Sequence, residues 1–440
     1  MDDLFTDTQD PRGTGPVTAR LRLLATTDLH IQLTGFDYVA DQPLSTHGMA
    51  GIASLIDTAR EEARTENRAC LLLDNGDLLQ GSAMGSFLAD QPVTKDHAVA
   101  ACMNDLGYDA IGVGNHDIDF GLDYLGAMSR VFSMPLLASN LSGVSCGVQA
   151  ATLLRCALPG TSDEISVGVL SVLPLETVRW NRYILGAEAA IEASGDCLRR
   201  AIPELRAQGA DVVVVLAHMG ITQERIDQLD SALELARVPG IDALIAGHTH
   251  RRFPGRDHLA EAGVFPGKGQ VLQVPAVMPG HSGSDLGVLD LTLSRGDGED
   301  WRVIGHVSSL RRDTPEVPAH PAVVAATDPA HRALRDYLAA PLGWTEKALH
   351  NYFSLAAPTA TGLLTSQAEA LTVQAALEGR DEASLPLIVA SSAHSAGGRN
   401  GPNNFLHIPQ GPVLRRHLAG LSPFSNEVWA VQVTGADIRQ

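Results

Sequence analysis

The stretch LRLLATTDLH, residues 21–30, joins an apolar, strand-like run to two side chains that commonly bind metals, Asp28 and His30. The same succession of an apolar run and a cluster of Asp, Asn or His recurs four times before residue 251. The later clusters are DNGD at 74–77, GNHD at 114–117, His218 after the run 212–217, and GHTH at 247–250. Parallel or mixed sheets gather such loops at the carboxyl ends of their strands, so we expect the five clusters to meet at one edge.

Segments with helical spacing lie between these apolar runs, and this alternation predicts an α/β fold. The helical segments are 52–64, 97–106, 122–131, 189–208 and 225–237. The run VVVVL at 212–216 is too continuously apolar for a half-exposed strand, and it indicates a strand covered on both faces. Strands without intervening helices, at 271–277 and 286–293, indicate that the sheets are mixed.

Composition excludes several classes of partner. Lys and Arg number 32 against 51 Asp and Glu, and the resulting formal charge of -19 repels nucleic-acid polymers. A small phosphate substrate remains compatible with this charge if bound cations reverse the field locally. The sequence holds no apolar stretch of about 18 residues, which argues against a membrane span.

A chain of 440 residues is too long for one compact core, so we expect more than one domain. We expect a flexible leader at 1–20, an α/β domain at 21–312 and a connector with a helix at 313–345. A second α/β domain would cover 346–440, with a helix at 368–378 and a strand at 428–433. A new helix starts to form at the end of the sequence, so this domain is expected to be cut short at Gln440.

The clusters supply carboxylate, amide and imidazole groups without thiolate, a set that favours Mn, Zn, Fe, Co or Mg. If the strands continue through Asp28 and His30, and again through His248 and His250, alternate side chains share one side. Taken alone, each motif also has an ordinary reading. His218 would be a core histidine, and Asp77 would cap a helix at 82–88. The ordered set favours a metal site over these readings.

The five clusters together resemble those of the calcineurin-like metallophosphoesterases, specifically the group of 5'-nucleotidases and 2',3'-cyclic-nucleotide 2'-phosphodiesterase/3'-nucleotidases. The resemblance extends over nearly all of residues 21–440. It implies a four-layer αββα sandwich followed by a C-terminal nucleotidase domain. It also implies two divalent metal ions, one held by Asp28, His30 and His250 and the other by Asn115, His218 and His248, with Asp77 as the bridge.

Two cations about 3.5–4 Å apart hold a bridging hydroxide, lower its pKa and neutralise the phosphate during in-line attack. The leaving oxygen still requires a proton, and His116, next to Asn115 in the sequence, is the candidate donor. Asp119 would orient the imidazole of His116. The alternative is that Asp119 is a turn residue or helix cap before 122–131.

Three stretches place the chain closest to the cyclic-phosphodiesterase/3'-nucleotidase branch: FDY at 36–38, DNGDLLQG at 74–81 and VPAVMPG at 274–280. His250 agrees, whereas Asp119 fits the 5'-nucleotidase pattern equally well. By resemblance, Arg399 would bind the substrate and Phe424 would stack on the base. A surface Arg and a core Phe are the alternatives. His281 either lines the metal cleft or is an exposed loop residue.

The leading prediction is therefore hydrolysis of 2',3'-cyclic nucleotides and nucleoside 3'-phosphates. The rivals are a 5'-nucleotidase or nucleotide-sugar hydrolase, and a nucleotide-binding remnant with little activity. The first 20 residues lack the pattern of a secretory leader, which favours the cytoplasm, whereas the resemblance favours the periplasm.

Overall fold

In the computed structural model, the described residues are 17–160, 163–222, 230–259, 261–296, 299–390, 395–397, 404–422 and 428–439. They form two compact units. The first holds the described residues up to Gly35, then Leu44–Gln80 and Leu88–Pro329, and the second holds Phe36–Pro43, Gly81–Phe87 and the described residues from Ala330 onward.

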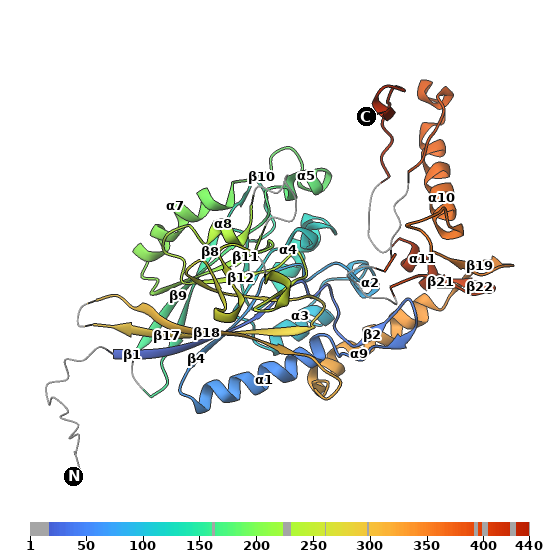
Figure 1. Cartoon of the computed structure of the whole chain (residues 1–440). Helices are drawn as coiled ribbons and strands as arrows, with labels where there is room; N and C mark the ends of the chain where they lie inside the picture. Colours follow the sequence, from blue (N-terminus) through green and yellow to red (C-terminus); the bar gives the residue numbers. More distant parts are fainter. Residues whose placement is uncertain are drawn as a thin grey trace, which may run out of the picture. The chain divides into compact units, whose positions relative to one another are not determined.

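The first unit contains two mixed sheets (Figure 1). One has the strand order β18-β17-β1-β4-β5-β6, in which β1, β4, β5 and β6 run parallel and β17 is antiparallel to both of its neighbours, β1 and β18. Its strands are β1 (Val17–Thr26), β4 (Ala69–Asp74), β5 (Ala110–Gly112), β6 (Leu136–Leu137), β17 (Asp285–Arg295) and β18 (Arg302–Arg312).

The other sheet has the order β14-β15-β16-β12-β11-β9-β8, and β13 also pairs with β16. Its parallel centre consists of β9, β11, β12 and β16. The strands are β8 (Ala151–Ala157), β9 (Glu164–Val172), β11 (Val212–Ala217), β12 (Ala243–Ala246), β13 (Arg252–Phe253), β14 (Val264–Phe265), β15 (Gln270–Val271) and β16 (Val274–Pro279).

The central strand β11 shows how the layers pack. Val212, Val214 and Leu216 face a core shared with the other sheet, and the alternate residues Val213 and Val215 face a core shared with helices. The prediction that this strand is covered on both faces is therefore confirmed.

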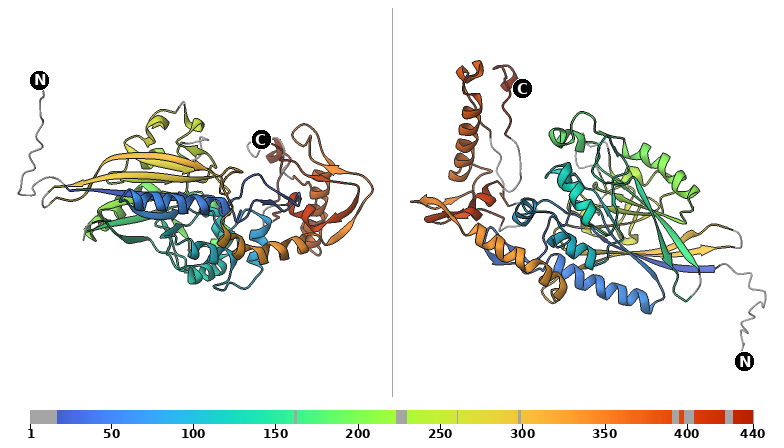
Figure 2. Two further views of the ribbon diagram at one scale, coloured as in Figure 1. Left: turned by 90° about the horizontal axis from the view of Figure 1, so that it is seen from below. Right: turned by 180° about the vertical axis from the view of Figure 1, so that it is seen from behind.

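The helices complete four layers. Helix α7 (Ser194–Ala207) and helix α8 (Ala232–Leu235) supply Leu198, Ile202 and Leu235 to the core on the outer face of the β11 sheet. Helix α1 (Met49–Thr65) packs on β1, β4 and β17, and Figures 1 and 2 show it on the side of the sheet pair opposite to α7. The expected αββα sandwich is confirmed.

Further helices of this unit lie in the segments between the strands. They are α3 (Ala98–Asp105), α4 (Leu122–Val131), α5 (Thr177–Trp180), α6 (Arg182–Leu185) and the 3-10 turn η1 (Asn115–Ile118). The helix expected from residue 189 begins only at Ser194, because β10 (Ala190–Ile191) pairs with β7 (Leu141–Ser142). Most of the first half of the helix expected at 225–237 lies outside the described residues.

The second unit contains short strand pairs and helices. Its elements are β2 (Phe36–Asp37), β3 (Gln42–Pro43), β19 (Pro341–Thr345), β20 (Leu349–His350), α10 (Ala360–Leu377), β21 (His407–Ile408), β22 (Gly411–Leu414) and α11 (Arg415–Leu421). Helices α2 (Ala83–Ala89) and α9 (Pro321–Leu338) belong partly to each unit.

The strand expected at 428–433 is wrong, since these residues form no regular element. Val431 is 74% exposed and Val433 51% exposed, so no buried face stabilises an extended ladder there. Among the described residues, no helix is long and apolar enough to cross a membrane.

Candidate metal centre

The five polar clusters lie in the loops that directly follow β1, β4, β5, β11 and β12, at their carboxyl ends. The expectation that β1 continues through Asp28 and His30 is wrong, because the strand ends at Thr26. Asp28 has φ 50° and His30 φ 48°, and the corresponding values are 69° for His248 and 58° for His250. A residue with positive φ is not in the extended conformation of a strand, so the alternation of side chains along a strand does not set the direction of these side chains.

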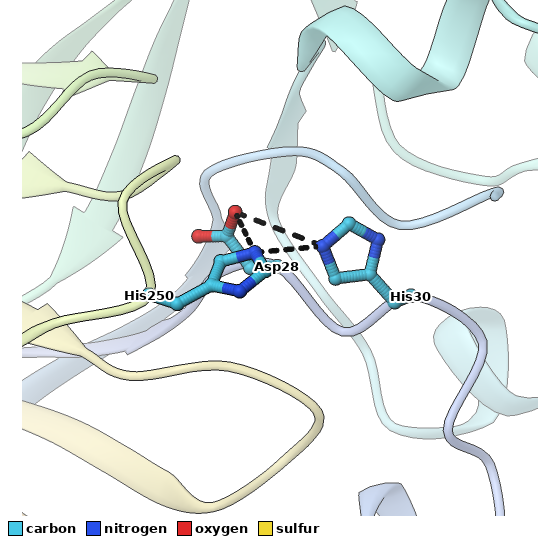
Figure 3. A group of neighbouring side chains, drawn as sticks. All are labelled: Asp28, His30 and His250. Atoms are coloured by element: carbon cyan, nitrogen blue, oxygen red, sulfur yellow. Dashed lines mark hydrogen bonds and ion pairs between the residues drawn. The ribbon is translucent and has the colours of Figure 1, made fainter. Parts of the chain in front are cut away.

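One group of ligand-type atoms comprises Asp28, His30 and His250, whose side chains point toward one another (Figure 3). Nε2 of His30 lies 3.0 Å from Nε2 of His250, and Oδ1 of Asp28 lies 3.5 Å from Nε2 of His250 and 4.0 Å from that of His30. Nδ1 of His30 donates to the Gln80 carbonyl at 2.6 Å, which leaves its Nε2 with a lone pair. Burial lowers the pKa of His30, so the neutral, metal-binding form is favoured.

A second group comprises Asp77, His218 and His248. Nδ1 of His218 donates to the Asn75 carbonyl at 2.7 Å, and its Nε2 lies 3.1 Å from Oδ2 of Asp77. Burial opposes a charge on His218, but Asp77 outweighs this cost and raises the pKa of His218 to about 10. Burial and the neighbouring His218 lower the pKa of His248 to about 4.

Asn115 is the remaining metal ligand that the resemblance implies. Its Oδ1 atom is buried and has no hydrogen-bond partner, and the same is true of Nε2 of His218. A buried acceptor without a hydrogen-bond donor is costly, and a bound cation would satisfy such an atom. Carboxylate, amide oxygen and imidazole are ligands that borderline and hard divalent metals accept. The residues therefore fit a metal pair.

Asp77 links the two groups. It belongs to the second group, and its carbonyl accepts the backbone N–H of His30 at 2.9 Å. Burial alone would raise the pKa of Asp77, but the charges of His218 and His116 outweigh this effect and hold the pKa well below its usual range. The sequence-based hypothesis requires Asp77 to lie beside His30, His218 and His248, and the structure brings them together.

His116 and Asp119 form a pair. Nδ1 of His116 lies 2.8 Å from Oδ2 of Asp119, and the ring of His116 lies 5.7 Å from that of His30, centroid to centroid. Burial would lower the pKa of His116, but the bond to Asp119 and the charge of Asp77 raise it to about 9. Asp119 is not the cap of α4, because Gly121 occupies that position, but it does lie in a turn, directly after η1.

Sequence reasoning missed Asp117. Its buried carboxylate accepts four backbone N–H groups, from Gly114, Asp77, Leu78 and Leu79, at 2.7–2.9 Å. It thus ties the loop after β4 to the loop after β5. The signal was present, because Asp117 is the third polar residue in succession after a buried strand, a placement that is costly without partners.

Sequence reasoning also missed Trp180 and Asn181. The indole of Trp180 stacks on the imidazole of His248, with ring centroids 5.6 Å apart and 18° between planes. Nδ2 of Asn181 donates to Oδ1 of Asp119 at 2.8 Å. No local pattern marks these residues, since they reach the centre from a segment far along the chain.

Of the two alternatives for His281, the structure supports proximity to the metal centre, because its ring stacks on His250 at 4.5 Å. Arg399 and Phe424, the expected substrate-binding residues, lie outside the described residues.

Comparisons with known proteins agree with this geometry. The family model described as calcineurin-like phosphoesterase matches residues 21–252. Over 96% of its length, the chain is 31% identical to the 2',3'-cyclic-nucleotide 2'-phosphodiesterase/3'-nucleotidase of Yersinia enterocolitica, and it spans 67% of that relative. Over 95% of its length, it is 30% identical to the trifunctional nucleotide phosphoesterase protein YfkN of Bacillus subtilis, of which it spans 29%. The crystal structure of calcineurin-like phosphoesterase YfkN from Bacillus subtilis superposes with a TM-score of 0.67 at 30% identity, covering 73% of this chain and 99% of that one.

Proposed function

The chain belongs to the calcineurin-like phosphoesterases, as its motifs indicate, and from this premise we propose that it is a two-metal hydrolase of 2',3'-cyclic nucleotides and nucleoside 3'-phosphates. The observation that carries the proposal is the presence of two neighbouring groups of metal-ligand side chains, since the charge of Asp77, in the second group, acts on Asp28 and His30 of the first. The substrate class is supported by the Yersinia enterocolitica relative, which matches 96% of this chain.

In this proposal each of the two sets of ligands would hold one metal ion. Asp28, His30 and His250 would hold one ion, Asn115, His218 and His248 would hold the other, and the carboxylate of Asp77 would contribute to both. Backbone carbonyls fix the tautomers of His30 and His218, so that each presents Nε2. When bound, the metal pair supplies a nucleophile from water near neutral pH and neutralises phosphate oxygens.

His116 is the proposed general acid. Asp119 accepts a hydrogen bond from the Nδ1–H of its ring and thereby sets the direction of Nε2. As the P–O bond breaks, Nε2 would transfer its proton to the leaving sugar oxygen. The first reaction would open the cyclic diester to a nucleoside 3'-phosphate, and the second would release the nucleoside and inorganic phosphate.

A 5'-nucleotidase activity is the second candidate, and the paired His116 and Asp119 are compatible with it, because Asp119 fits the pattern of that branch equally well. Both candidates would use the same metal centre, and they differ in the phosphate ester that is cleaved and in the sugar oxygen that leaves.

The test uses the full chain loaded with Mn²⁺ and offers 2',3'-cyclic AMP, 3'-AMP and 5'-AMP in turn. We expect the cyclic substrate to yield 3'-AMP and then phosphate, and the Asp77→Asn variant to yield neither. Phosphate from 5'-AMP alone would replace the proposal by the second candidate. Two bound metals without hydrolysis of these nucleotides or of bis-p-nitrophenyl phosphate would leave only the nucleotide-binding remnant.

A further inference from the structure

Asn181, between α5 and α6, contacts the candidate proton donor indirectly. It is only 4% exposed, and its Nδ2 donates to Oδ1 of Asp119 at 2.8 Å and to the carbonyl of Asn115 at 3.4 Å. Both partners are acceptors, so the amide must present its NH₂ group to them. The orientation of the Asn181 side chain is thus determined by its surroundings.

The contact extends the His116–Asp119 pair to three residues. Oδ1 of Asp119 accepts from Asn181, and Oδ2 faces Nδ1 of His116 at 2.8 Å. With both oxygens engaged, the carboxylate plane is fixed, and the imidazole ring is fixed in turn. The side chain of Asp119 is 23% exposed, so without Asn181 water would compete for Oδ1 and the carboxylate could rotate.

We propose that Asn181 is a positioning residue for proton donation by His116, an inference that rests on the proposed function. As the P–O bond to the sugar breaks, the leaving oxygen takes the proton of Nε2, and Nδ1 keeps the proton that it shares with Asp119. Loss of Asn181 should therefore slow the departure of a sugar alkoxide, which needs a proton. Departure of p-nitrophenolate, a weak base, should be slowed much less.

A purely structural role is the rival explanation, because Asn181 also binds the backbone of Asn115. Asn140 provides a matched control. It is 2% exposed, and its Nδ2 likewise donates to backbone carbonyls, those of Leu173 and Glu192, at 2.9 and 3.1 Å. None of the contacts described for Asn140 involves His116 or Asp119.

The experiment compares wild type, Asn181→Ala and Asn140→Ala as Mn²⁺-loaded full chains. The kcat is measured on 2',3'-cyclic AMP and on bis-p-nitrophenyl phosphate, together with metal content and melting temperature. We expect Asn181→Ala to lower kcat on the cyclic nucleotide by about 10–100-fold, the usual cost of losing an outer-shell contact. The loss on the p-nitrophenyl ester should be several-fold smaller, two metals should remain bound, and Asn140→Ala should change both rates by the same factor.

Asn181→Asp, which keeps the size of the side chain but sets a carboxylate against Asp119, should give the same selective loss if the Ala variant does not fold. Equal losses on both esters, or loss of metal from the Asn181 variants, would overturn the inference and leave the proposed function intact. An equally selective loss in Asn140→Ala would also overturn it. A wild-type protein inactive on the cyclic nucleotide would overturn the proposed function, and this inference with it.

Discussion

Nε2 of His218 lies 3.1 Å from Oδ2 of Asp77, and both atoms are buried. Because Nδ1 of His218 donates to the Asn75 carbonyl, Nε2 of the neutral ring carries a lone pair. Two acceptors at this distance repel each other unless a cation lies with them. The raised pKa of His218 indicates that a proton on Nε2 would fill this role without metal, and a metal would replace it.

Replacing Asp77 should disable the centre. Asp77→Asn keeps the shape of the side chain but removes its negative charge, so we expect weaker binding of both metals. We also expect phosphodiesterase activity to fall by at least about 1,000-fold, because several kcal/mol of charge stabilisation are lost and each factor of ten in rate corresponds to about 1.36 kcal/mol. Metal content by mass spectrometry and initial rates would measure this. Asp57→Asn, at a surface ion pair with His320, is the control. Full metal content and activity in Asp77→Asn would contradict the assignment.

Removing Asp117 should destabilise the first unit, because four buried N–H groups would lose their acceptor. An unpaired buried donor costs about 1–3 kcal/mol, so we expect Asp117→Ala to reduce stability by at least about 3 kcal/mol. Urea denaturation would measure the change. Asp109→Ala, which removes the acceptor of the Leu72 N–H, should cost less. Equal effects of the two substitutions would show that Asp117 does not anchor the loops.

The sequence predicted regular elements well where local patterning decides them. Helix α4 occupies the expected residues 122–131, and β11 the expected 212–217. Burial on one or both faces imposes a period on the sequence, so these elements can be recognised from the chain alone.

The ligand loops could be located from sequence, but their backbone could not. Asp28, His30 and Asp77 have positive φ, an uncommon conformation for residues other than glycine. Backbone hydrogen bonds between the two loops stabilise this conformation: the N–H of Asp28 donates to the Gly76 carbonyl, and the N–H of His30 donates to the Asp77 carbonyl. Contacts between distant segments, such as Asn181 with Asp119, likewise leave no local signal.

Asp74 should make stability depend on pH in the metal-free protein. Burial raises the pKa of Asp74 from 3.8 to about 8, although Thr26 and the Gly76 N–H donate to its oxygens. The folded state therefore binds the Asp74 proton more tightly than the unfolded state does. The stability gained from this proton is fully present below about pH 4 and is lost as the pH rises through about 8. In EDTA, the melting temperature of wild type should fall relative to Asp74→Asn between pH 5 and 9. If wild type and Asp74→Asn differed in melting temperature by the same amount at pH 5 and at pH 9, the prediction would be wrong.

Tryptophan fluorescence should report metal binding through Trp180. This indole is 44% exposed and stacks on His248, a proposed ligand, so a paramagnetic ion held by His248 would lie within quenching range. We expect Mn²⁺ added to EDTA-treated protein to lower the emission, and Trp180→Phe to remove most of this response. Trp301→Phe is the matched control, because Trp301 is buried in the core and packs under Arg295. If Trp180→Phe retained the full response while Trp301→Phe lost it, His248 would not hold the ion.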